Sequence, residues 1–379
     1  MGLKNETKTG YNTKTFYEEY VEGMNTRQLG REFQSDSDRL KRLYEEVVKQ
    51  KNPKVASEDL SFSQRTLSLL SALTKRLNPV RRLVFGISIV TFISHYLFNI
   101  LGLSGLIFHP ALLPVSFLGM LLILMIELLE KSDVQKELDF ARDIQLSLLP
   151  PSSAIFNNLE INSFAATALE VGGDYVDIIH TESGTYIIIA DVSGKGMSAA
   201  LYMVRIQALV HLLINKLHPG PKDLFLELNN YIKSNKKDKT FITGCAAFFP
   251  KGEDYFTFAR AGHNNPIVYN KEKDATFKIN TPGFALGMTS TPTLRKNMKE
   301  SRFKFEEGDS LLFYTDGLVE ARNNRNEEYG YERLEGLFSI YGSLHSKTIT
   351  SKIQSSVESF LGEEKPLDDI TFTTIHKTS

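Results

Sequence analysis

Two long apolar runs follow one another in the first half of the chain, and they restrict its fold more than any other feature. Residues 83–106 read LVFGISIVTFISHYLFNILGLSGL, and residues 107–129 read IFHPALLPVSFLGMLLILMIELL. Neither run contains Lys or Arg, and Glu127 is their only acidic residue. Because a helix of roughly 20 apolar residues crosses the hydrocarbon of a bilayer, the runs predict a two-helix transmembrane hairpin over 81–130. Their length and lack of charge favour this hairpin over the alternative, a helical pair buried in a soluble core.

Basic residues flank the predicted hairpin on both sides. They are Lys75, Arg76, Arg81 and Arg82 at its start and Lys131 after its end. Because basic residues are enriched on the cytoplasmic side of a membrane, both ends of the hairpin and the chain that follows are expected in the cytoplasm. The first residues, MGLKNETKTG, lack the apolar stretch of a cleaved signal peptide.

The segments beside the hairpin have helical patterns of their own. Residues 1–80 are expected to form a cytoplasmic, mostly helical segment that serves packing or partner binding. Residues 131–151 predict a helical linker that ends at Pro150 and Pro151. Its apolar stripe consists of Val134, Leu138, Ala141, Ile144 or Gln145, and Leu148. Such a stripe fits either plain packing or a parallel coiled coil in a homodimer.

Composition excludes several classes of function. The formal net charge is −1, so no overall field favours a nucleic-acid partner. The single cysteine, Cys245, rules out a disulfide framework and a cysteine-rich zinc site within one chain. A lone cysteine in an apolar run is usually a small core residue.

The remaining residues, 152–379, predict one α+β domain. Strand-like runs bounded by turn residues, such as YVDIIH, TYIIIADV and SLLFYTDG, alternate with helical patterns at 197–217, 221–234, 331–341 and 347–361. Hairpin signals between the runs indicate antiparallel sheets that carry separate helices.

Aspartates recur at the ends of the predicted strands. They are Asp174 after two glycines, Asp191 at the end of YIIIAD, Asp316 at the end of SLLFYTD, and Asp368 and Asp369 before ITFTTIH. Each one alone is typical of a turn. Together they would repel one another, and a divalent cation relieves that repulsion. Two such ions about 3.5–4 Å apart are a known arrangement for phosphoryl chemistry, so the pattern predicts a hydrolase with a Mg²⁺ or Mn²⁺ centre.

Seven motifs give the domain a resemblance to a known family. In chain order they are VGGDYVD (171–177), ADVSGKGMSAALYMV (190–204), RAGHNNPIVY (260–269), TPGFALGM (281–288), EEGDSLLFYTDGLVEARN (306–323), EEYGYERL (327–334) and LDDITF (367–372). The set resembles the SpoIIE-like, or RsbU-like, branch of the PPM (type 2C) metal-dependent serine/threonine protein phosphatases. The resemblance covers about residues 140–376 and implies an α-β-β-α sandwich with the metal centre at one edge of the two sheets.

The resemblance also implies a role for each matching residue. Asp191 would bridge two Mn²⁺ or Mg²⁺ ions, the Val192 carbonyl would complete one site, and Asp174 would serve the second ion. Asp316 and Asp369 would hold the first ion. Four further residues would support the centre: Gly173, Gly194, Gly317 and Asp368.

Two polar residues in the motifs remain open at this point. His263 in AGHN could act as a general acid, or it could hold the backbone of a tight turn. Lys195 in SGKG could contact phosphate or remain solvated.

The implied substrate is phosphoserine or phosphothreonine on a protein, often an anti-sigma-factor antagonist of the STAS type in bacterial partner switching. The implied location is the bacterial cytoplasmic membrane, as a multi-pass protein with a cytoplasmic catalytic domain. One alternative is a catalytically silent membrane scaffold with a phosphatase-like domain. The other is a nucleotide cyclase, because GGDYV superficially resembles a GGDEF motif; such a cyclase would not need acids at 191, 316 and 369.

Overall fold

The computed structural model describes residue 74 and residues 77–102, 109–234 and 240–379. Almost all of the predicted helical segment 1–80 lies outside the described residues. The chain divides into two compact units, Met1–Ser132 and Asp133–Ser379. Each unit is described by itself.

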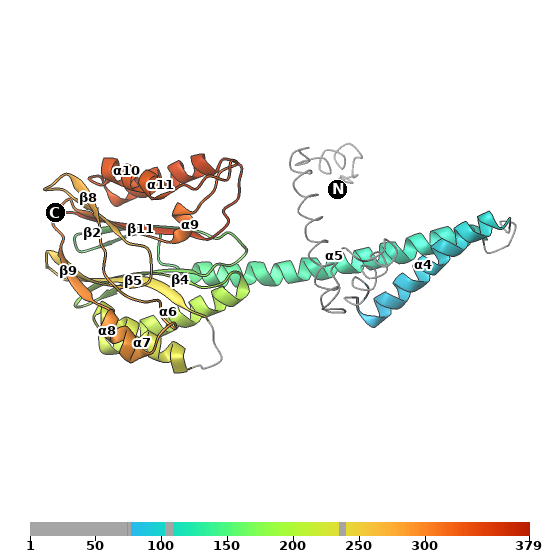
Figure 1. Ribbon diagram of the computed structural model, residues 1–379, viewed down its shortest axis with the longest axis horizontal. Helices are drawn as coiled ribbons and strands as arrows, with labels where there is room; N and C mark the ends of the chain where they lie inside the picture. Colours follow the sequence, from blue (N-terminus) through green and yellow to red (C-terminus); the bar gives the residue numbers. More distant parts are fainter. Residues whose placement is uncertain (1–73, 75–76, 103–108, 235–239) are drawn as a thin grey trace, which may run out of the picture. The chain divides into compact units, whose positions relative to one another are not determined.

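In the first unit, the two apolar runs form helices that pack against each other (Figure 1). Helix α4 spans Pro79–Ile100 and begins after Asn78, whose side chain accepts a hydrogen bond from the backbone of Val80. Helix α5 spans His109–Leu148, so the predicted linker continues the second apolar helix without a break. Both helices are long and apolar enough to cross a membrane.

Contacts between α4 and the first part of α5 show that the two helices run antiparallel. Arg81, near the start of α4, donates to Glu127 at 2.8 Å and also pairs with Glu130. About two turns further along α4, the backbone carbonyl of Ser88 accepts from the Ser116 hydroxyl at 2.8 Å. The apolar side chains between these contacts are mostly exposed.

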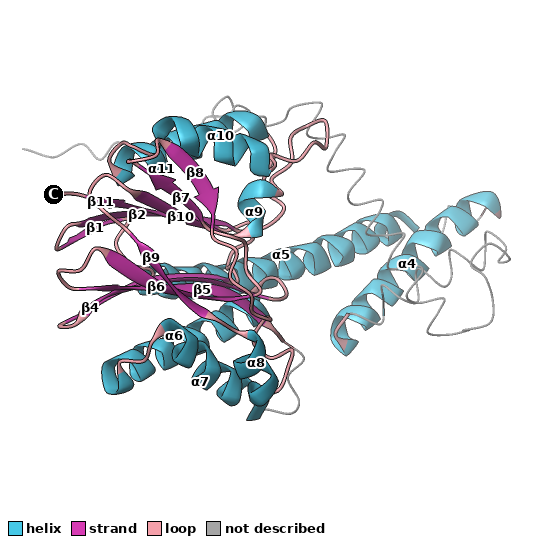
Figure 2. Cartoon of the chain, turned by 60° about the vertical axis from the view of Figure 1, so that its left-hand side comes forward, coloured by secondary structure: helices cyan, strands magenta, loops and turns pink. Residues whose placement is uncertain are grey.

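The second unit contains two antiparallel sheets that lie face to face (Figure 2). The six-stranded sheet has the order β1 (Ser153–Phe156), β2 (Leu159–Ala166), β11 (Ile370–Lys377), β10 (Ser310–Tyr314), β7 (Ile267–Asn270) and β8 (Ala275–Lys278). The five-stranded sheet has the order β3 (Asp174–Thr181), β4 (Gly184–Val192), β5 (Ile242–Pro250), β6 (Tyr255–Ala261) and β9 (Glu300–Lys304).

The central strands are mostly apolar because both of their faces are buried. In β4, Ile187 and Ile189 join the cluster between the sheets, whereas Ile188 packs on the helix side. In β10, Phe313 faces the other sheet and Leu312 faces the helices. This arrangement explains why neither strand alternates between apolar and polar residues.

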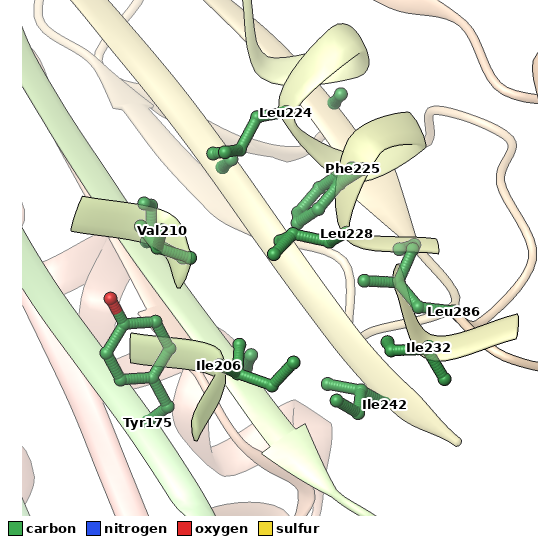
Figure 3. Close-up of a cluster of buried hydrophobic side chains, with 14 of the residues drawn as sticks. Tyr175, Ile206, Val210, Leu224, Phe225, Leu228, Ile232, Ile242 and Leu286 are labelled. Atoms are coloured by element: carbon green, nitrogen blue, oxygen red, sulfur yellow. The ribbon is translucent and has the colours of Figure 1, made fainter. Parts of the chain in front are cut away.

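Helices cover the outer face of each sheet. Helices α6 (Met197–Leu217), α7 (Pro221–Ser234) and α8 (Thr291–Asn297) lie on the five-stranded sheet, and α10 (Tyr331–Tyr341) and α11 (Ser346–Leu361) lie on the other. Figure 3 shows Ile206 and Val210 of α6 among the buried side chains between the five-stranded sheet and its helices. The predicted α+β sandwich is confirmed.

Helix α6 and Cys245 both lie in the interior of the domain. Helix α6 is also long and apolar enough to cross a membrane, yet Met203, Ile206, Val210 and Ile214 are buried in the domain core. Cys245 is fully buried between the sheets, as predicted, and burial raises the pKa of its thiol.

Candidate functional site

The five-stranded sheet brings two of the predicted aspartates together. Strand β3 begins at Asp174 and β4 ends just after Asp191, and the antiparallel register places these two residues opposite each other. The next strand, β5, places Thr243 opposite Asp191. The backbone N–H of Val192 donates to the carbonyl of Gly173 at 3.3 Å. The register of one hairpin therefore fixes two candidate ligands side by side.

The six-stranded sheet contributes the other acids. Asp316 opens the short helix α9 (Asp316–Val319) directly after β10, while Asp368 and Asp369 precede the adjacent strand β11. The backbone N–H of Thr315 donates to the carbonyl of Thr371 at 2.9 Å and closes this end of the ladder. Neighbouring strand ends thus place these acids close together.

Two hydrogen bonds join the two sheets at the acids, and a third holds Asp369 within the six-stranded sheet. The Thr315 hydroxyl donates to Oδ2 of Asp174 at 2.9 Å. Asp369 accepts from the backbone N–H of Gly173 at 2.7 Å and from that of Ala168 at 2.8 Å. The predicted acids therefore converge at one edge of the sandwich, contributed by both sheets.

The carboxylates at this edge are crowded and partly buried, and both conditions raise their pKa values. Burial, together with the charges of Asp191 and Asp369, raises the pKa of Asp174 well above its usual value, although hydrogen bonds from Thr371 and Thr315 oppose the rise. Burial and then the charge of Asp316 raise the pKa of Asp191 to about 7. Burial is also the main reason why the pKa values of Asp316 and Asp369 are raised.

The residues present fit an oxygen-coordinated divalent cation. A Cβ atom at Gly173 would lie 2.9 Å from the carbonyl oxygen of Val192 and 3.6 Å from Oδ1 of Asp191, so the glycine keeps this space open. Among the residues that the structure describes, no three Asp, Glu, His or Cys side chains enclose a metal position by themselves. Mg²⁺ and similar ions need no such cage, because they bind through one or two carboxylates and keep several waters.

The supporting glycines act through the backbone. Gly194 has φ +108° and Gly196 has φ +71°, values that favour glycine, in the loop between β4 and α6. A Cβ atom at Gly317 would collide with the backbone carbonyl of Asp369. Gly317 therefore allows the start of α9 to approach the segment that carries Asp369.

Lys195, between Gly194 and Gly196, is neither free in solvent nor buried. Its ammonium group lies 2.6 Å from Oδ2 of Asp368 and donates to the carbonyl of Leu367 at 2.8 Å. The side chain is nevertheless 53% exposed. The lysine thus links the β4–α6 loop to the segment before β11 across the acidic edge.

His263 lies next to the acids but is held in a structural network. Its Nδ1 is 2.8 Å from the hydroxyl of Thr243, the residue opposite Asp191. Arg260 donates to the His263 carbonyl at 2.6 Å and to that of Thr281 at 2.8 Å. Burial lowers the pKa of His263 to about 4, so the ring is neutral at pH 7, which favours the structural interpretation over a general acid.

Sequence reasoning missed two residues that hold the site. Thr315 is fully buried and orients Asp174, and nothing in its sequence context identifies that partner. The side chain of Gln145 donates to the Gly172 carbonyl at 2.7 Å and accepts from the Gly172 N–H at 3.1 Å. Gln145 is 6% exposed and Ile144 is 45% exposed, so the polar residue, not the apolar one, faces the domain.

Comparison with known proteins agrees with this arrangement. The sequence model of stage II sporulation protein E (SpoIIE) matches residues 181–378. Phosphoserine phosphatase RsbU of Bacillus subtilis (strain 168) is 28% identical over 193 residues, which are 51% of this chain and 56% of RsbU. Protein IcfG of Synechocystis sp. is 24% identical in an alignment of 269 residues that covers 64% of this chain and 41% of IcfG. The chain thus spans about half the length of these curated relatives.

A solved structure shares the fold. The SiaA-PP2C domain of Pseudomonas aeruginosa superimposes with a TM-score of 0.57 at 18% identity, covering 66% of this chain and 99% of that domain. The match to the SpoIIE sequence model extends over more than half of the chain and begins after Asp174. The resemblance read from the motifs is confirmed, and the chain belongs to the SpoIIE family.

Proposed function

We propose that the chain is a metal-dependent phosphatase that hydrolyses phosphoserine or phosphothreonine on a protein substrate. The observation that carries the proposal is the convergence of Asp174, Asp191, Asp316 and Asp369 from both sheets at one edge. Membership of the SpoIIE family and the similarity to a phosphoserine phosphatase support the same activity. The family match leaves the cyclase alternative without support.

The proposed ligands of two Mn²⁺ or Mg²⁺ ions are the four aspartates and the Val192 carbonyl. Such ions, when bound, lower the pKa of water and neutralise phosphate oxygens. The chain itself supplies orientation: Thr315 holds one oxygen of Asp174, and the Gly173 N–H holds one oxygen of Asp369. These bonds fix the orientation of the two carboxylates.

The test is phosphate release from a phosphoserine peptide by the full chain in detergent, with and without Mn²⁺. Asp191→Asn removes a ligand charge and is expected to lower turnover at least about 100-fold, because a metal contributes several kcal/mol to such a reaction. Asp223→Asn, an exposed acid on α7, is the matched control. Full activity of Asp191→Asn with Mn²⁺ would overturn the proposed site. A folded chain that binds Mn²⁺ but releases no phosphate would favour the silent scaffold.

We also infer the cellular setting. The hairpin over 81–130 would anchor the chain in the bacterial cytoplasmic membrane, with the linker 131–151 and the phosphatase domain 152–379 in the cytoplasm. The apolar helices and the basic residues around them support this topology. The substrate would be a phosphorylated antagonist of the STAS type in partner switching, as the family resemblance implies. Labelling of Cys245→Ser variants that carry one new cysteine on either side of the hairpin tests the topology.

The linker offers two faces for regulation. Val134, Phe140 and Ile144 are exposed apolar side chains on α5 and would form the seam of a homodimer. Gln145 instead contacts Gly172, next to the proposed ligands. A change at the linker could therefore reach the metal centre through a single loop.

A further inference from the structure

We propose that Lys195 binds the phosphoryl group of the substrate, and that Asp368 holds its ammonium group in place until the phosphoryl oxygens displace it. This inference rests on the proposed phosphatase function and assigns the phosphate-binding side chain of that site. It follows from where the lysine lies, what it is bonded to and how weakly it is held.

The position of Lys195 places a positive charge at the acidic edge. The residue lies in the short loop between Val192, the end of β4, and Met197, the start of α6. Its ammonium group reaches across to Leu367 and Asp368, directly before Asp369. It is close enough to oppose the effect of burial on the pKa of Asp191. Lys195 therefore places a positive charge beside Asp368, the residue next to the proposed ligand Asp369.

A phosphate monoester needs such a cation. It carries up to two negative charges and must approach a cluster of carboxylates. Arg260 cannot serve, because its guanidinium is committed to the His263 and Thr281 carbonyls. Arg322 pairs with Glu328 and Asn326 in the hairpin after α9. Lys195 presents a compact charge with three donors, of which the structure accounts for two.

The pair with Asp368 is suited to exchange. The side chains of Lys195 and Asp368 are 53% and 45% exposed, and ion pairs of that exposure contribute about 0–1 kcal/mol. A phosphoryl group offers more negative charge and more oxygen acceptors than one carboxylate, so it can replace Asp368 at small cost. The loop also has room to follow, because nothing lies within 4 Å of a Cβ position at Gly194.

The competing explanation is that Lys195 only ties the loop to Asp368. A double-mutant cycle separates the two. The probe is inorganic phosphate, measured both by calorimetric titration and as an inhibitor of peptide hydrolysis, with the full chain in detergent and saturating Mn²⁺. Lys195→Met is expected to weaken phosphate binding and to raise KM for the phosphoserine peptide, each about 10- to 100-fold, which is the range for a charge-assisted hydrogen bond. Lys195→Arg should restore most of the loss.

Asp368→Asn supplies the decisive half of the cycle. It frees the ammonium group, so phosphate should bind more tightly than in the parent chain, and this gain should disappear in the Lys195→Met background. Lys216→Met, at the exposed far end of α6, is the matched control and should change nothing. The concentration of Mn²⁺ that half-saturates activity should not rise in Lys195→Met, because lysine is not a metal ligand.

The outcomes are distinct. Unchanged phosphate binding in Lys195→Met, or an equal gain from Asp368→Asn with and without the lysine, would overturn the inference. A parent chain that releases no phosphate from the peptide would instead overturn the proposed function. The calorimetric titration would then still decide whether Lys195 binds phosphate.

Discussion

Gln145→Leu is expected to loosen the loop that precedes Asp174. The side chain bonds both the N–H and the carbonyl of Gly172, at 3.1 and 2.7 Å, and both residues are buried. Leucine fills a similar volume but leaves both backbone groups without a partner. A buried polar group that loses its partner costs about 1–3 kcal/mol. If the loop relaxes in part, the local cost is about 2–3 kcal/mol, or roughly 30- to 150-fold in a local opening equilibrium.

Amide hydrogen exchange of the full chain in detergent measures that opening directly. The Gly172 amide should exchange roughly 30- to 150-fold faster in Gln145→Leu. The Gly173 amide, which donates to Asp369, should accelerate with it if the loop opens as a unit. Gln145→Glu is the matched control, because a carboxylate still accepts from the Gly172 N–H and so should produce an intermediate effect. An unchanged Gly173 amide in Gln145→Leu would refute the idea that the linker holds the ligand loop.

Two further perturbations probe the acidic edge. Gly173→Ala places a methyl group 2.9 Å from the Val192 carbonyl and 3.1 Å from Cβ of Ala199. The concentration of Mn²⁺ that half-saturates activity should therefore rise at least about tenfold, which corresponds to over 1 kcal/mol of strain. Gly336→Ala, in open space on α10, should leave that concentration unchanged, and equal values for the two variants would contradict the crowding argument. The metal-free chain should become more stable to heat as the pH falls from about 7 to about 4, because the pKa of Asp191 is raised from 3.8 to about 7 by burial and by Asp316, so the folded state binds more protons than the unfolded state in that window. Saturating Mn²⁺ should reverse the trend, since protons then compete with the metal, and a metal-free chain that is most stable at pH 8 would contradict the crowding of the carboxylates.

Sequence patterns predict the elements of this chain well where burial is one-sided or complete. The apolar run YIIIAD predicts a strand, and β4 is a strand with both faces buried. The run in α6 was correctly placed in the domain, although its length and composition equally suit a membrane helix. Its neighbours in sequence decide the matter, because it lies between strands of one sheet whose outer face it covers.

Contacts between side chains far apart in sequence are where prediction from the sequence ends. A helical stripe predicts that position 144 or 145 faces the domain, and hydrophobicity favours Ile144, yet the buried residue is Gln145. The reason lies in the partner: the N–H and carbonyl of Gly172 lie opposite this position. An amide side chain accepts from the one and donates to the other, whereas isoleucine can do neither. No residue of the linker indicates that the backbone of Gly172 lies opposite it. The bond between Thr315 and Asp174 likewise spans 141 positions.

The acids could be predicted because an aspartate at the end of an apolar strand is visible in the sequence. The groups that compensate its charge lie elsewhere in the chain and are not. A carboxylate at the end of an apolar strand is unfavourable wherever its partner lies, so Asp191 and Asp316 stand out in the sequence before any fold is known. The fold adds that burial, and after it the charges of neighbouring acids, raises the pKa values of Asp174 and Asp191. Such crowding destabilises the metal-free protein at neutral pH and favours any cation that enters. The same charges that make the domain less stable without metal would therefore make its metal affinity high. Thr315, Gly173 and Lys195 hold Asp174, Asp369 and Asp368 in place.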